Sequence, residues 1–163
     1  MEQEDFLLAE RLIPHRSRMM LIEGIRNPDK NGLQAEARVR EDWPMYEKGA
    51  VSSIICIELI AQSVSAFGTW RRGSAAVPRI GFLVGVKSAE FTTTTLPIDT
   101  KLTIRVEEVS RVGKYGVFKG QVTSGSTRFC NAVIQVLDSG EDILQNINAI
   151  QTKGLGVNSW RLW

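Results

Sequence analysis

The sequence predicts an α+β fold in which one long helix packs against one antiparallel sheet. Apolar residues recur with helical spacing from Val51 to Arg72, a stretch of roughly 20 residues. On both sides of this stretch, apolar and polar residues alternate with a period of two, which is typical of half-buried strands. Strands, then one helix, then more strands favour a single sheet that is covered by that helix.

Before the long helix, the sequence predicts a short helix and a hairpin. Residues 5–13 gather apolar side chains around a polar set, with Asp5 as the cap and Pro14 as the stop. Residues 19–25 are an apolar run and residues 33–39 alternate cleanly, so both predict strands. The Asn-Pro-Asp-Lys-Asn-Gly run between them has the composition of a turn.

The long helix has signals at both ends. Ser52 or Ser53 is a plausible N-cap, because a hydroxyl oxygen can accept a bond from a free backbone N–H. Arg71 and Arg72 suit the negative end of the helix dipole, and Gly73 predicts the stop.

After the long helix, the remaining core is strand-like. Gly113 and the Ser-Gly pair at residues 124–125 predict tight turns between strands. The predicted strands are residues 79–95, 101–110, 115–123 and 129–137.

Length and charge indicate one domain with no nucleic-acid partner. The chain has 163 residues and a net charge of +2, whereas nucleic-acid binding usually shows as a strong basic excess. We expect the domain to span residues 1–138 and residues 139–163 to be a tail, to which the sequence assigns no role. The first ten residues lack a secretory signal, and the most apolar stretch, residues 54–67, is too short and polar to span a bilayer. These features predict a cytoplasmic protein.

The cysteines and the histidine predict no metal site. Cys56 and Cys130 have no metal-like spacing, so we expect two free thiols in a reducing compartment. A site built from several histidines is excluded because His15 is the only one in the chain.

A narrow polar stripe on the long helix is the strongest functional signal. Glu58, Gln62, Ser65 and Thr69 fall within a sector of roughly 60° on a helix that is otherwise almost entirely apolar. Such a helix is usually buried, and a carboxylate buried in it would hold its proton more tightly than in water, which suits proton transfer. The alternatives are that the stripe faces solvent or that Glu58 forms an ordinary salt bridge.

Two motifs resemble a known family. The Leu-Ile-Pro-His-Arg run at residues 12–16, followed by an apolar strand, resembles the opening of bacterial 3-hydroxyacyl acyl-carrier-protein dehydratases. The Ile-Glu-Leu-Ile-Ala-Gln run at residues 57–62 is similar to their helix motif. The resemblance extends from Leu7 to Leu137. It implies a hotdog fold, in which an antiparallel sheet wraps a long helix, and a dimer with active sites at the subunit interface.

One departure from the family pattern bears on the catalytic residues. The main family carries a histidine in a Gly-His-Phe-Pro segment just before the helix, and the corresponding residues 43–51 contain none. The chain therefore looks most similar to a divergent subgroup associated with aryl-polyene-type lipid synthesis. His15 is then the only imidazole available as a base near neutral pH, although it also fits a loop residue without chemistry.

The resemblance implies a dehydratase acting on a 3-hydroxyacyl thioester of phosphopantetheine, with no diffusible cofactor. We expect His15 to take the α-proton, Glu58 to protonate the leaving hydroxyl, and Gln62 to orient Glu58 or the hydroxyl. The residues expected to bind substrate, partly through backbone N–H groups that hold the thioester oxygen, are Gly49, Val51, Ser52 and Ser65.

The expected partner is an acyl carrier protein or coenzyme A. The expected assembly is a homodimer or higher oligomer, or a heteromer containing a second hotdog subunit. Two other functions remain open on the same fold: hydrolysis of an acyl thioester, and a catalytically silent partner or acyl-binding module. The cations that could dock an acidic carrier are Arg16, Arg18, Arg71, Arg72, Arg79, Lys87 and Arg111.

Overall fold

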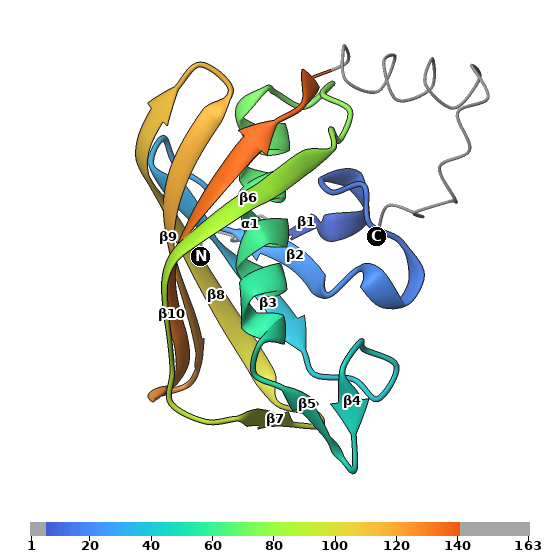
Figure 1. Cartoon of the computed structure of the whole chain (residues 1–163). Helices are drawn as coiled ribbons and strands as arrows, with labels where there is room; N and C mark the ends of the chain where they lie inside the picture. The colour runs from blue at the N-terminus through green and yellow to red at the C-terminus, as the bar shows by residue number, and fades with distance from the viewer. Residues whose placement is uncertain (1–5, 141–163) are drawn as a thin grey trace, which may run out of the picture.

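A seven-stranded antiparallel sheet curves around one helix in the computed structural model, which describes residues 6–140 (Figure 1). The helix, α1 (Ile55–Arg71), lies against the inner face of this sheet. Across the sheet the strands are β1 (Leu7–Leu8), β2 (Ile22–Arg26), β3 (Gly32–Arg38), β8 (Lys101–Val112), β9 (Tyr115–Ser124), β10 (Thr127–Asp138) and β6 (Gly81–Phe91).

A second, smaller sheet lies beside the N-terminal end of α1 (Figure 1). It consists of three short antiparallel strands, β4 (Tyr46–Glu47), β5 (Ala50–Ser52) and β7 (Thr95–Pro97). The predicted strand at residues 79–95 therefore divides into β6 and the first residue of β7. None of the three strands was predicted, because strands this short carry too few residues for a periodic signal.

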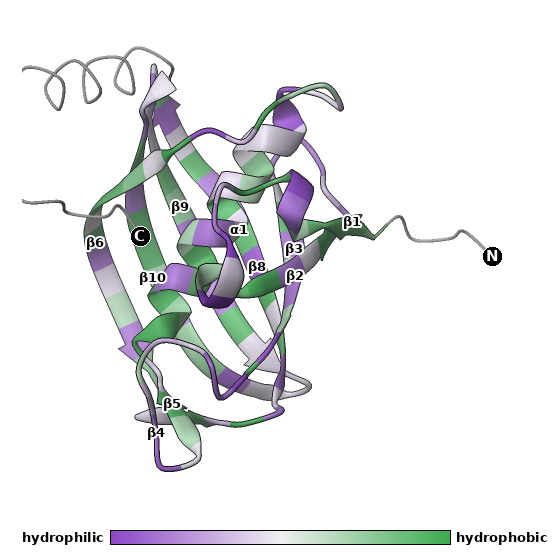
Figure 2. Cartoon of the chain, turned by 90° about the vertical axis from the view of Figure 1, so that its right-hand side faces the viewer, coloured by the Kyte–Doolittle hydropathy of each residue, from purple (hydrophilic) through white to green (hydrophobic). Residues whose placement is uncertain are grey.

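The core lies between α1 and the inner face of the large sheet. Apolar and polar residues alternate along β8 and β9, so one side of each strand packs on the helix (Figure 2). Phe67 of α1 and Phe118 of β9 are fully buried and meet edge to face, with ring centroids 6.1 Å apart. Where Ile60 approaches the sheet, Gly120 leaves room for it, since a Cβ there would lie 2.4 Å from the Ile60 side chain.

The remaining predicted strands and turns are confirmed to within a few residues. The hairpin of β2 and β3 and the three strands from β8 to β10 lie where the alternating pattern indicated. Gly113 and Gly125 adopt the positive φ angles of 57° and 56° that their turns require. Gly73, at φ 102°, follows the last turn of α1, as predicted.

The predicted start of the long helix is wrong. The helix begins at Ile55, because residues 50–52 instead form β5 and pair with β7. Neither Ser52 nor Ser53 caps it, since the residue at the N-cap position is Ile54 and makes no side-chain capping bond.

The predicted N-terminal helix is also wrong over the described residues. Leu7 and Leu8 form β1 and pair with Ile25 and Gly24 of β2, and a single 3₁₀ turn at Ala9–Arg11 follows. Pairing with an open strand edge supplies backbone hydrogen bonds that outweigh a local helical pattern.

The predicted domain boundary coincides with the end of β10 at Asp138. Ser139 is buried, and its N–H donates to the carbonyl of Ile80 at 3.3 Å. The rest of the expected tail, residues 141–163, lies outside the described residues. Among residues 6–140, no helix is both long enough and apolar enough to cross a membrane.

Candidate active site

An apolar groove opens beside the first turns of α1, with a volume of about 360 Å³. Among residues 6–140, Glu58 is the only acid that lines the groove, and Met45 and Ile54 are roughly half exposed, at 52% and 57%. Apolar side chains so exposed favour an apolar ligand or partner. The lining residues are Arg18, Met19, Pro44, Met45, Ile54, Ile55, Ile57 and Glu58.

Gln62 holds Glu58 from one helical turn further on. Its Nε2 donates to Glu58 Oε1 at 2.9 Å and to the carbonyl of Met19 at 2.7 Å. Its Oε1 accepts the N–H of Leu21 at 2.9 Å and, at 3.5 Å, that of Ile22. The amide is therefore committed to four protein groups and fully buried. Through these hydrogen bonds, Gln62 connects residues 19–22, which follow His15, to the helix that carries Glu58.

His15 lies against the same carboxylate. Its Nε2 is 3.4 Å from Glu58 Oε1, with side-chain exposures of 17% for His15 and 33% for Glu58. Its Nδ1 is buried with no hydrogen-bond partner among residues 6–140. Burial lowers the pKa of His15; the Glu58 charge opposes this and the Arg16 charge adds to it. The lowered pKa favours the neutral imidazole at pH 7.

Glu58 is less buried than its apolar helix suggested. One third of its side chain remains exposed, on the side where it lines the groove. The polar stripe as a whole is not a solvent-facing surface either, since Gln62 and Thr69 are buried. Thr69 accepts a hydrogen bond from Arg72 at 3.2 Å and belongs to the far end of the helix rather than to the groove.

The four residues predicted to bind substrate do not line this groove. Val51 is buried in β5, and the Ser52 N–H already donates to the carbonyl of Met45 at 3.2 Å. Gly49 lies in the turn between β4 and β5, at φ 85°, and Ser65 lies two turns beyond Glu58. Their absence from the groove follows from the later start of α1, which brings residues 54–58 there in their place.

The apolar wall was missed by sequence reasoning. Pro44 and Met45 precede the small sheet, and nothing in their spacing distinguishes them from an ordinary loop. Met45 has a φ of 64°, in the left-handed region that a side chain of this size rarely adopts. Such strain persists only where surrounding structure holds it, often beside a binding site.

The cations expected to dock a carrier separate in space. Arg18 lines the groove, whereas the Arg16 guanidinium donates to three backbone carbonyls nearby. At the other end of α1, Arg71 and Arg111 both bind Glu108, at 2.6 and 2.8 Å. Arg18 is therefore the predicted docking cation that lines the groove together with Glu58.

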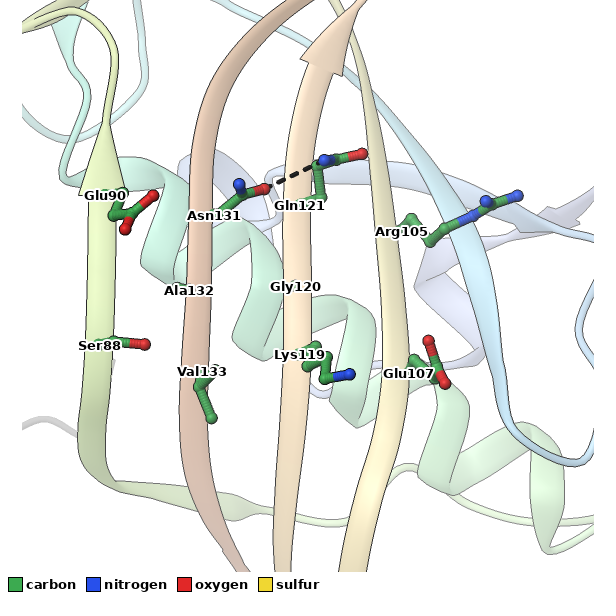
Figure 3. Close-up of a pocket in the computed structure, with 10 residues that line it drawn as sticks. All are labelled: Ser88, Glu90, Arg105, Glu107, Lys119, Gly120, Gln121, Asn131, Ala132 and Val133. Carbon is green, nitrogen blue, oxygen red and sulfur yellow. Dashed lines mark hydrogen bonds between the residues drawn. The ribbon is translucent and has the colours of Figure 1, made fainter.

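A second hollow of about 360 Å³ lies on the outer face of the sheet, turned away from α1 (Figure 3). Its lining is mostly polar and includes Glu90, Arg105, Glu107 and Lys119, and it has no contact with Glu58 or His15. The groove beside α1 is the better candidate for chemistry, because it joins an apolar wall to a hydrogen-bonded acid and a neutral imidazole.

One long helix wrapped by an antiparallel sheet defines the hotdog fold, the fold that the two sequence motifs implied. Residues 7–148 match the model of the ApeP-like family, described as ApeP dehydratase, and the chain belongs to this family. It is therefore a dehydratase, a hydro-lyase. The matched region runs past the predicted end of the domain at residue 138.

Solved structures support the same fold. The dehydratase heterocomplex ApeI:P from Xenorhabdus doucetiae aligns with a TM-score of 0.76 and 21% identity, over 88% of this chain and 99% of that chain. A hypothetical thioesterase with coenzyme A from Streptococcus pneumoniae aligns at 0.55 and 17%, over 71% and 84%. Cj0977, a sigma28-regulated virulence protein from Campylobacter jejuni, aligns at 0.62 and 13%, over 82% and 88%. A comparison with curated proteins found no match.

Proposed function

We propose that this dehydratase converts a 3-hydroxyacyl thioester, carried on the phosphopantetheine of an acyl carrier protein, to the trans-2-enoyl thioester. The pathway we infer is fatty-acid or aryl-polyene-type lipid synthesis in the cytoplasm, a setting that suits the free thiols of Cys56 and Cys130. One observation supports this most: Glu58 is the single acid among the described residues of an apolar groove and has an imidazole with a lowered pKa beside it.

The apolar wall suits the acyl part of such a substrate. Ile54, Ile57 and Met45 offer apolar surface next to Glu58, so an acyl chain lying there would bring its α and β carbons near the carboxyl group. The groove also borders the first turn of α1, where the positive end of the helix dipole favours the negative charge that develops on the thioester oxygen.

The elimination needs one proton acceptor and one proton donor. We assign the first task to His15: its neutral imidazole takes the proton from the α carbon. Glu58 acts as the proton donor to the β-hydroxyl, the C–O bond breaks and water leaves. Gln62 has no hydrogen-bonding group left for substrate, so we assign it the positioning of Glu58 alone.

The decisive experiment compares Glu58→Gln, His15→Gln and Glu47→Gln in an assay of enoyl thioester formation. Glu47 is a matched control, since its carboxylate is 77% exposed on β4. We expect the first two variants to lose at least about 100-fold in kcat/KM, the usual scale of acid–base catalysis, while Glu47→Gln retains activity. Wild-type turnover by a folded Glu58→Gln protein would refute the assignment. Release of free thiol in place of enoyl product would favour thioester hydrolysis.

The free edge of β6 suits a second hotdog subunit. β6 is the last strand of the large sheet and, among residues 6–140, pairs only with β10, so no described strand covers its outer backbone edge. It also exposes apolar side chains, Val84 at 52% and Val86 at 45% among them. We propose that a second hotdog subunit, of this or a related sequence, extends the sheet here; the heterocomplex from Xenorhabdus doucetiae supports a related one.

The β6 contact can be tested by placing a charge on it. We expect Val84→Lys to lower the affinity for the second subunit in sedimentation experiments, and Val77→Lys, at an exposed valine outside β6, to leave it unchanged. If turnover by the chain appears only after a second hotdog subunit is added, the active unit is the heteromer. Equal affinity in both variants would place the contact elsewhere.

A further inference from the structure

The outer face of the large sheet carries a row of four polar side chains on four adjacent strands (Figure 3). Arg105 of β8 is in register with Gln121 of β9, Gln121 with Asn131 of β10, and Asn131 with Glu90 of β6. The row therefore has a cation at one end, two amides in the middle and an anion at the other end.

The charges at the two ends of the row have no partner in the part of the chain that the structure describes. Within residues 6–140, neither Arg105 nor Glu90 forms an ion pair or a side-chain hydrogen bond. They lie three strands apart, and neighbouring strands are about 4.8 Å apart, so they cannot reach each other.

The two amides in the middle are only partly satisfied. Gln121 Nε2 donates to Asn131 Oδ1 at 3.1 Å, and among residues 6–140 the Gln121 oxygen and the Asn131 amino group have no partner of their own. The Gln121 oxygen could therefore accept a hydrogen bond from the Asn131 amino group of a second copy of the row.

The order of the row is self-complementary. A two-fold axis parallel to the strands, between β9 and β10, would turn a second copy face to face with the first and reverse its strand order. Arg105 of the first copy would then lie opposite Glu90 of the second copy. Glu90 of the first copy would lie opposite Arg105 of the second copy. The open oxygen of Gln121 would oppose the open amino group of Asn131. Two ion pairs and two amide contacts follow from this one operation.

We propose that the outer face of the sheet, centred on the row from Arg105 to Glu90, is a second interface, at which two copies of this chain pack back to back. The occupant is a second copy because the charge order matches its own reverse, whereas an acidic or a basic partner would suit only one end. The hollow of about 360 Å³ on this face gives long side chains of the second copy room to enter. Strand addition at β6 uses the sheet edge instead, so both contacts can coexist.

The test is a charge exchange followed through the mass of the full-length chain in sedimentation velocity. Arg105→Glu and Glu90→Arg each place like charges opposite one another at both ends of the contact. We expect either variant to weaken association at least about tenfold. The double variant R105E/E90R restores opposite charges in reversed order and should regain the wild-type mass. Lys101→Glu, an exposed change on the same strand outside the row, is the matched control and should associate like wild type.

Three results would overturn this interface: equal masses for the wild type and both single variants, a folded double variant that stays dissociated, or association unaffected by salt. The salt arm needs no variant, because surface ion pairs weaken between about 0.05 and about 0.5 M salt. If the mass is unchanged in Val84→Lys but halved in Arg105→Glu, the copies associate through the outer face alone.

Discussion

Polar groups on the inner and outer faces of the large sheet differ in burial and in hydrogen bonding. Toward the inner face, the Gln62 amide is fully buried and every one of its bonding groups is used by the protein. On the outer face, Arg105 and Glu90 stand in water without protein partners in the described residues. The difference follows from hydration: a buried polar group without a partner is unstable, whereas an exposed charge is held by water and stays available.

The largest stability difference between the faces is expected at two glutamines. Gln62→Ala would leave the Met19 carbonyl and the Leu21 N–H without a partner in a buried site, so we expect a loss of about 2–4 kcal/mol in the free energy of unfolding. Gln34→Ala, on the outer side of β3, should change it by less than about 0.5 kcal/mol. Urea unfolding measures both, and similar losses at the two positions would contradict the contrast.

Two glycines are expected to differ in how an added Cβ changes stability, one where α1 contacts the sheet and one inside α1. A Cβ at Gly120 would strike Ile60, so Gly120→Ala should destabilise the protein by about 1–3 kcal/mol. Gly68, inside α1, has open space where its Cβ would lie, so Gly68→Ala should stabilise by about 0.5–1 kcal/mol. Thermal unfolding would show opposite shifts in Tm; a shift of the same sign in both variants would mean that the helix does not pack on Gly120.

The smallest effect is expected in the pH dependence of stability at His15. Because burial lowers its pKa below 6.5, the unfolded chain takes up a proton at a pH where the folded chain does not. Stability should therefore fall as pH drops from 6.5 to the lowered pKa, and His15→Gln should lose less stability over the same window. Urea unfolding at several pH values compares the two slopes, and parallel slopes would show that the imidazole titrates as freely as in the unfolded chain.

The sequence alone determined the architecture through local periodicity. Spacing of 3.6 residues in α1 and of two residues in β3 and β8 is a property of each segment, so the helix and the positions of the longer strands along the chain followed directly. It also singled out Glu58, since one acid in an apolar helix is visible without a structure. His15 followed from its place in the Pro-His-Arg motif and from being the only histidine in the chain.

Tertiary structure decided what depends on contacts between distant segments. The start of α1 was set by the pairing of β5 with β7, and the fate of residues 7–8 by the open edge of β2. The meeting of His15 with Glu58 joins segments far apart in the chain, and so does the groove, which Met19 and Ile57 line together. Periodicity reports how a segment distributes its own side chains, whereas a site is formed by the partners that packing brings together.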